Sequence, residues 1–166
     1  MIVEAVITTG RSLPWKARDD RELRIDVAGI KARIDTGIPV LHRHNWEAST
    51  LGYLDDAWIE DGSLKGALVL TGKQGRALYR KAMRGEFIGV SSGIEVLEST
   101  EERGLHSYFI RTFTARRSQL TEVSITPSPA DSEAFVMRLL DDDEIGATRY
   151  RMAKLHRKML RRQLDH

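Results

Sequence analysis

The sequence lacks cysteine altogether. This excludes disulfides, thiol nucleophiles and thiolate metal sites, and it permits a reducing cytoplasm. No apolar run approaches the ~20 residues that a helix needs to cross a bilayer. No basic segment followed by an apolar stretch lies near residue 1, so we expect no secretory signal. Internal repeats and low-complexity stretches are also missing. The expected class is a globular protein without a membrane partner.

The composition that is present fits one folded domain of ordinary size: 166 residues, 41% hydrophobic and 30% charged. The net charge of +2 is unevenly distributed, because residues 148–166 hold seven basic residues against the single acid Asp165. This segment carries about +6, which leaves about −4 on the rest of the chain. A nucleic-acid-binding body needs its own positive field, so we consider that function unlikely for the body. Salt-dependent nucleic-acid binding through the tail stays a minor alternative.

Most of the chain has the pattern of short β-strands. Apolar and polar residues alternate at 23–27, as a half-buried strand requires. Similar runs occur at 2–8, 38–42, 50–59, 64–70, 87–97, 105–114 and 119–126, most of them punctuated by Gly, Asp or Pro. This spacing predicts a β-rich α+β fold, in which an antiparallel sheet forms a closed or partly open β-barrel with a few flanking helices.

Helical patterns are fewer. Residues 73–84 predict a helix that stops at Gly85. A second, short helix is expected after the Pro-rich turn at 127–129, capped by Asp131 or Ser132 and ending near Leu140. From about residue 146 onward, Met and Leu recur at helical spacing between Arg and Lys. We therefore predict a β-barrel domain at 1–141 and a basic amphipathic C-terminal helix at 142–166.

The first segment with candidate chemistry is an apolar strand at 38–42 that runs into His44. Histidine is the side chain that accepts and returns a proton most readily near neutral pH. Strand alternation puts His42 and His44 on the same face, so the pattern does not choose between them. A histidine at a strand end is more often a plain surface residue. The pair could also bind a metal, but no third ligand of matching pattern lies nearby, and we expect neither metal nor cofactor.

The second segment is a β-forming stretch at 87–96 that contains Ser91, Ser92 and Gly93. Glycine weakens a strand interior, so its presence here indicates that another backbone approaches closely. Such a place suits a serine nucleophile with N–H groups that stabilise an oxyanion. The competing interpretation is a bulged strand whose serines hydrogen-bond to their neighbours.

The third segment is a strand at 119–126 that leads into a Pro-Ser-Pro-Ala turn. Alternation predicts Leu120, Glu122 and Ser124 on one face of this strand. In one interpretation Glu122 pairs with Arg116 or Arg117. In the other it accepts a hydrogen bond from a histidine and fixes the tautomer of the ring. Together the three segments supply a base, a nucleophile and an orienting carboxylate, which is the set required for acyl transfer by serine.

These segments resemble the prohead maturation serine proteases of tailed bacteriophages, which are related in fold to the herpesvirus maturation proteases (assemblins). The similar motifs are the apolar strand running through His44 to a Gly-containing strand at 51–53, the Ser-x-Gly-aliphatic motif at 91–94, and the Leu-x-Glu-Val-Ser strand with its Pro-Ala turn at 120–130. The order of the motifs agrees with the family, and the resemblance covers roughly residues 1–140. Ser92 stands where the family often has an aliphatic residue, so a register with Ser92 as nucleophile stays open. Ile94 replaces a commonly aromatic residue.

The resemblance implies a serine endopeptidase in which Ser91 is the nucleophile, His44 the general base and Glu122 the orienting acid. Backbone groups at Ser92 and Gly93, or the side chains of Arg116 and Arg117, are the expected oxyanion or substrate contacts.

The implied substrate is scaffold protein, or a scaffold-like segment of the capsid protein, and the chain itself. The implied location is the assembling prohead in the host cytoplasm, and a homodimer is a further expectation. The alternative is a catalytically inactive capsid-assembly or scaffold-binding module of the same fold.

Overall fold

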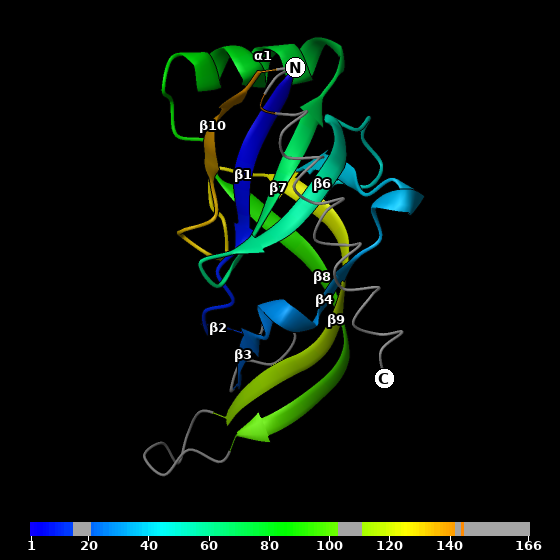
Figure 1. The fold of residues 1–166 in the computed structure, drawn as a ribbon, viewed down its shortest axis with the longest axis vertical. Coiled ribbons are helices and arrows are strands. Elements are labelled where there is room, and N and C mark those ends of the chain that lie inside the picture. Colours follow the sequence, from blue (N-terminus) through cyan, green and yellow to red (C-terminus); the bar gives the residue numbers. More distant parts are fainter. Residues whose placement is uncertain (15–20, 103–110, 142–143, 145–166) are drawn as a thin grey trace.

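The computed structural model describes residues 1–14, 21–102, 111–141 and 144. These residues form a curled β-sheet, one α-helix and two 3₁₀ turns (Figure 1). The strands are β1 (Ile2–Thr8), β2 (Leu13–Pro14), β3 (Arg21–Ile25), β4 (Ile30–Ala32), β5 (Pro39–His42), β6 (Gly52–Glu60), β7 (Ser63–Leu70), β8 (Val90–Glu102), β9 (Arg111–Ile125) and β10 (Val136–Leu140). The helix α1 spans Gly72–Met83, and the turns η1 and η2 span Val27–Gly29 and Ile34–Thr36.

Neighbouring strands follow the order β10-β1-β7-β6-β5-β9-β3-β2, and β4 and β8 also pair with β9. The β-rich α+β class is confirmed, as is a helix close to 73–84. The sheet is mixed, however, and the prediction of a purely antiparallel one is wrong. β3, β4 and β5 all run parallel to β9. These three strands follow one another along the chain and run in the same direction, with η1 between β3 and β4 and η2 between β4 and β5. β9 is 15 residues long, so it can pair with each of them in turn.

The sheet curls until β8 meets β10. Gly89 forms an isolated antiparallel bridge with Phe135, and backbone hydrogen bonds of 2.9 Å join residues 88–90 to 134–136 on both sides of it. Beyond this bridge, the β8–β9 hairpin extends away from the rest of the sheet, with β2 and β3 beside it, whereas α1 covers the opposite end (Figure 1). The two edges of the sheet therefore join at one end and separate towards the other.

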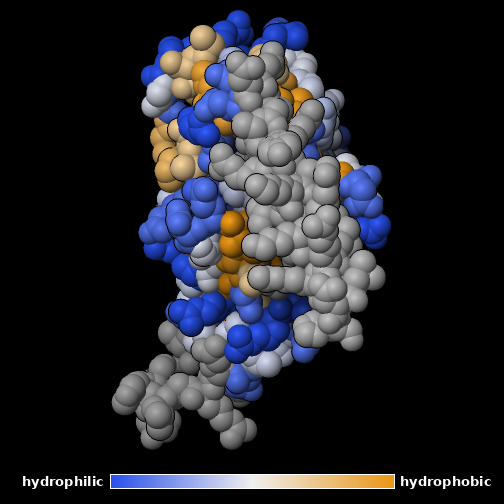
Figure 2. All heavy atoms as spheres, viewed as in Figure 1, coloured by the Kyte–Doolittle hydropathy of each residue, from blue (hydrophilic) through white to orange (hydrophobic). Residues whose placement is uncertain are grey.

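Apolar side chains fill the inside of the curl. Alternation along β1 places Val3, Ala5 and Ile7 in the core with no exposed surface. Three side chains of α1, Leu78, Tyr79 and Ala82, pack against this core from the covered end. Burying a Val, Leu or Ile side chain completely contributes roughly 1.5–3 kcal/mol to the free energy of unfolding, so the core is the main source of stability. Outside, hydrophilic residues make up most of the coloured surface in Figure 2, with hydrophobic residues in small patches in its upper and middle parts.

The prediction of a short helix between residues 132 and 140 is wrong, because Val136–Leu140 forms the strand β10. A cap does begin as expected, since Asp131 Oδ1 accepts a hydrogen bond from the N–H of Glu133. The turn does not propagate, because the backbone beyond it pairs with the edge of β1. A run of four or five apolar residues suits a strand or a helix equally, and the open edge of β1 decides between them. The predicted basic helix at 142–166 lies outside the described residues, apart from Glu144.

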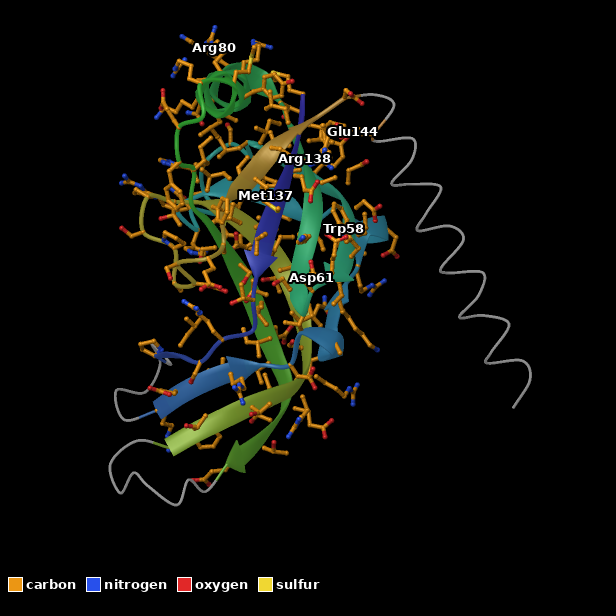
Figure 3. The ribbon with its side chains drawn as sticks, turned by 60° about the vertical axis from the view of Figure 1, so that its left-hand side comes forward. Trp58, Asp61, Arg80, Met137, Arg138 and Glu144 are labelled. Atoms are coloured by element: carbon orange, nitrogen blue, oxygen red, sulfur yellow. The ribbon has the colours of Figure 1, made fainter. Side chains whose placement is uncertain are left out.

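Side chains reinforce the β1–β10 pairing. Arg138 Nε donates a 2.9 Å hydrogen bond to Oε2 of Glu4, whose carboxylate is almost fully buried, and a second guanidinium nitrogen binds Glu144. Figure 3 shows Arg138 and Glu144 close together at β10. The hydrogen bond that Arg138 donates to Glu144, and then the nearby charge of Glu4, raise the pKa of the Arg138 guanidinium. The described helices include none that is both long and apolar enough for a membrane span.

Candidate active site

His44 lies in a tight turn that follows β5. Arg43 and His44 have φ values of 51° and 59°, and the N–H of Asn45 returns to the carbonyl of His42. Positive φ at both central residues is the geometry of a type I′ turn, and it costs non-glycine residues about 1 kcal/mol or more each. Strained residues of this kind cluster at functional sites, where the surrounding structure holds them in place. The turn is therefore a local reason to look for function at His44.

The turn matters because it sends the chain back over β9. Leu41 and His42 lie beside Ser124 and Ile125, so a straight continuation of β5 would put residue 44 five positions further along β9 than Glu122. That distance is about 16 Å in an extended strand. Instead, the N–H of His44 donates a 2.9 Å hydrogen bond to Ser124 Oγ, and its side chain reaches Glu122. His42 lines a different surface hollow, beside α1 and residues 125–127, so the structure separates the two histidines.

The imidazole of His44 contacts the carboxylate of Glu122 directly. Nδ1 of the ring lies 2.6 Å from Oε1 of Glu122. The other carboxylate oxygen, Oε2, accepts a 2.7 Å hydrogen bond from the hydroxyl of Ser124. Glu122 is only 2% exposed, and a buried carboxylate needs such partners to offset its lost hydration. With Nδ1 next to Glu122, Nε2 lies on the opposite side of the ring and is the nitrogen left for a reacting group.

Gly93 makes room for this carboxylate. It lies opposite Glu122 in the β8–β9 register. A Cβ atom at Gly93 would lie 2.4 Å from Oε1 of Glu122 and 2.7 Å from its Cγ, well inside van der Waals contact. The glycine that weakens β8 is therefore required by the side chain of the facing strand, which is one of the close approaches that strand glycines permit.

A β-bulge next to this pair sets which residues of β9 face the site. Gly93 pairs with Glu122, but the next residue, Ile94, pairs with Leu120, so Thr121 is the extra residue. The bulge turns Leu120 into the core, where it is 1% exposed. The prediction that Leu120 shares a face with Glu122 is therefore wrong, although the same prediction for Ser124 agrees with the Ser124–Glu122 hydrogen bond.

Ser91 lies directly opposite Ser124, two residues from Gly93 on the same side of β8. Ser92 lies opposite Val123, a fully buried core residue, so alternation directs its side chain towards the other face. Ser91 is 7% exposed, and it lines the same cleft as His44. Among the contacts of the described residues, none is a hydrogen bond between Ser91 and the His44 ring. Catalytic hydrogen bonds are often long in a free enzyme and tighten only when substrate binds.

The cleft that contains Ser91 and His44 has a volume of about 360 Å³. It lies where β8 and β1 separate beyond the Gly89–Phe135 bridge, and residues of β2, β3 and the turn at 130–131 complete it. Ser92 and Gly93 line it as well. The arrangement places a strand-borne hydroxyl and an imidazole held by a carboxylate at one concave surface, which is a combination that nucleophilic catalysis can use.

Arg116 and Arg117 do not lie at this cleft. Arg116 contacts Asp26 at 3.9 Å and the hydroxyl of Thr100 at 3.3 Å, and Arg117 contacts Glu98 at 3.5 Å. Both arginines sit at least five residues before Glu122 on β9, which is about 16 Å along an extended strand. The prediction that Arg116 or Arg117 contacts the oxyanion or substrate at Ser91 is therefore wrong. The alternative interpretation, that Glu122 pairs with one of them, is wrong for the same reason.

Sequence reasoning gave no role to Ser124, which binds both the backbone of His44 and the side chain of Glu122. The Glu-Val-Ser spacing was the available signal, because residues two apart on a strand share a face. Asp131 was also missed as part of the cleft. Within the described residues, no cluster of three or more His, Asp or Glu could hold a metal ion. The comparisons with family models, curated proteins and solved structures gave no match to this chain.

Proposed function

We propose that the protein is a serine endopeptidase in which Ser91, His44 and Glu122 form the catalytic triad. The observation that carries the proposal is the 2.6 Å contact between His44 Nδ1 and a buried glutamate, with a serine hydroxyl lining the same cleft. His44 follows β5, Glu122 lies on β9 and Ser91 on β8, and the proposal is supported because His44 contacts Glu122 and lines the same cleft as Ser91 although the three are far apart in sequence. A structural ion pair would not need the third group or the cleft.

The roles follow from the contacts. Glu122 holds the Nδ1–H of His44, which fixes the neutral tautomer and stabilises the imidazolium formed during turnover. Nε2 then removes the proton from Ser91 Oγ as the hydroxyl attacks a peptide carbonyl, and it later returns that proton to the leaving amine. Ser91 is preferred to Ser92 as the nucleophile because it shares a strand face with Gly93, opposite Glu122. The backbone N–H of Ser92 is the proposed oxyanion donor, since Ser92 lines the cleft and alternation from Val90 directs this N–H away from β9, whereas the N–H of Gly93 faces β9.

We assign the natural substrate on the strength of the sequence motifs. Their similarity to the prohead maturation proteases favours scaffold protein, or a scaffold-like segment of the capsid protein, and the chain itself. The reaction would take place inside the assembling prohead. Enclosure with the substrate raises the effective concentration, so a modest intrinsic rate would suffice. A homodimer belongs to the same proposal, and a fold of the herpesvirus-protease type is its structural counterpart.

The test uses the purified full chain, its Ser91→Ala variant and Ser92→Ala as the matched control. A fluorophosphonate probe should label Ser91 in the wild type and in Ser92→Ala, and mass spectrometry should locate the adduct. Incubation with the cognate scaffold and capsid proteins should yield fragments that Ser91→Ala does not produce. Equal cleavage by folded Ser91→Ala would remove Ser91 from its role. Absence of both labelling and cleavage in the wild type would instead favour the inactive assembly module.

A further inference from the structure

We propose that the cleft beside Ser91 selects substrates with a large aliphatic side chain next to the scissile bond. The proposal rests on the proposed protease function and adds its substrate class. It comes from what surrounds the catalytic groups in the cleft. Apolar side chains from four strands line it: Ile7, Leu13, Leu23, Ile25, Ile94 and Val96.

The cleft is large enough for a substrate side chain. Its volume of about 360 Å³ is roughly twelve times the ~30 Å³ that a water molecule occupies in the liquid. Ile94 and Val96 follow Ser91 and Gly93 along β8, and the cleft takes in residues from both faces of this strand, so the apolar wall begins within a few residues of the nucleophile. A side chain that flanks the bond under attack would therefore meet this wall.

Asp131 is the single carboxylate among the described residues that line the cleft, and its oxygens already have partners. Asp131 is 4% exposed. Its Oδ2 accepts hydrogen bonds from the backbone and hydroxyl of Thr9, at 2.7 and 2.8 Å, and from the hydroxyl of Thr8 at 3.4 Å. Its Oδ1 accepts from the N–H of Glu133 and lies 3.8 Å from Arg11 Nε. These contacts tie the turn after residue 130 to the end of β1. A carboxylate with this many partners has little capacity left to recruit a basic substrate residue.

The edge of β8 offers a way for a peptide to reach the cleft. Val90 directs its N–H away from β9, to the carbonyl of Ala134, and alternation gives Ser92 the same direction. Past the Gly89–Phe135 bridge, β8 pairs only with β9 among the described residues. An extended peptide pairing with this edge would lie across Ser91 and place alternate side chains in the cleft.

The experiment compares kcat/KM for a fluorogenic peptide series that differs only at the residue on either side of the cleaved bond. The bond is first located in the cognate scaffold. Leu, Ile or Val should exceed Gly, Asp and Lys by at least tenfold at one of the two positions, because an apolar pocket discriminates at that level for each missing or charged group. Preference for Lys would show that Asp131 remains available and would overturn the proposal. Equal rates for all peptides would do the same.

Two variants on β8 provide a matched pair. Val96 lines the cleft, whereas its neighbour Leu97 is 48% exposed and does not. Val96→Lys should lower kcat/KM for the Leu peptide at least tenfold and raise that for the Asp peptide, whereas Leu97→Lys should leave both within twofold. Unchanged selectivity in folded Val96→Lys would refute the assignment. If thermal melting shows that Val96→Lys does not fold, Leu13→Ala on the short strand β2 should shift the preference from Leu towards Phe.

The outcomes for the two proposals are separable. Fluorophosphonate labelling of Ser91 does not depend on a substrate side chain, so it reports the nucleophile alone. Labelling together with flat selectivity, or with no peptide cleaved, would reject the aliphatic cleft and keep the catalytic serine. Cleavage that persists in Ser91→Ala, or no labelling at all, would reject the proposed function itself.

Discussion

Replacing Gly93 with alanine tests the candidate site most directly, because Gly93 carries no catalytic side chain. The added Cβ would lie 2.4 Å from Oε1 of Glu122, whereas ordinary contact begins near 3.4 Å. The carboxylate must therefore retreat by about 1 Å. A retreat of that size would lengthen its contact with His44 Nδ1 from 2.6 Å to about 3.6 Å, which is no longer a hydrogen bond.

The expected result is a loss of about 100-fold or more in kcat/KM, since a misplacement of about 1 Å in a catalytic group has an effect of that order. Overpacking of the buried pair should also lower the free energy of unfolding by about 1–3 kcal/mol. Peptide hydrolysis and urea unfolding measure the two quantities separately. A control at Glu95, Glu95→Ala, changes an exposed residue of the same strand and should do neither. Near-wild-type hydrolysis by folded Gly93→Ala would show that the His44–Glu122 contact is not needed for turnover.

Three further predictions concern Ser124 beside this pair, Arg116 and Arg117 away from the cleft, and Arg138 on β10. Ser124→Ala removes one hydrogen bond to Glu122 and one from the His44 backbone, so kcat should fall about tenfold with a smaller change in KM, measured by steady-state kinetics. Arg116→Ala and Arg117→Ala should each keep peptide hydrolysis within twofold, because both side chains lie away from the cleft; a large loss would restore them as substrate contacts. Arg138→Met leaves the buried carboxylate of Glu4 without its partner and should lower the free energy of unfolding by about 1–2 kcal/mol, discounted for the half-exposed guanidinium. A double-mutant cycle with Glu4→Gln checks the last value, and additive effects would contradict it.

The strands were largely predictable because their apolar alternation is local, and β1, β5, β6, β7 and β8 fall close to the expected ranges. The parallel pairing along β9 was not predictable in this way, since it depends on which edge a short strand reaches in three dimensions. β10 was assigned as a helix because its few apolar residues carry no distinct period. Pairing with β1, rather than propensity, decides its structure.

The candidate site was predicted only in part for related reasons. The pattern of the sequence offered both His42 and His44, and the choice depends on a turn with positive φ at two residues that are not glycine. Nothing in the local sequence marks such a turn, because Asn-Gly or Gly-Gly usually signals it. The inward rotation of Leu120 likewise comes from a bulge at Thr121 that ideal alternation cannot anticipate. The sequence correctly indicated that another group approaches Gly93 closely. That group is the side chain of Glu122 rather than a backbone.

The site depends on a single strand, β9, which carries Glu122 and Ser124 and pairs with both other contributors. β5 lies along one edge of it and delivers His44 through the turn, while β8 lies along the other edge and places Ser91 opposite Ser124. Any change that shifts β9 would therefore displace all three groups of the proposed triad and weaken the sheet at the same time. Loss of activity alone cannot separate these effects. Pairs of variants on adjacent residues of β8 can do so, because neighbours on a strand share the backbone and point to opposite faces.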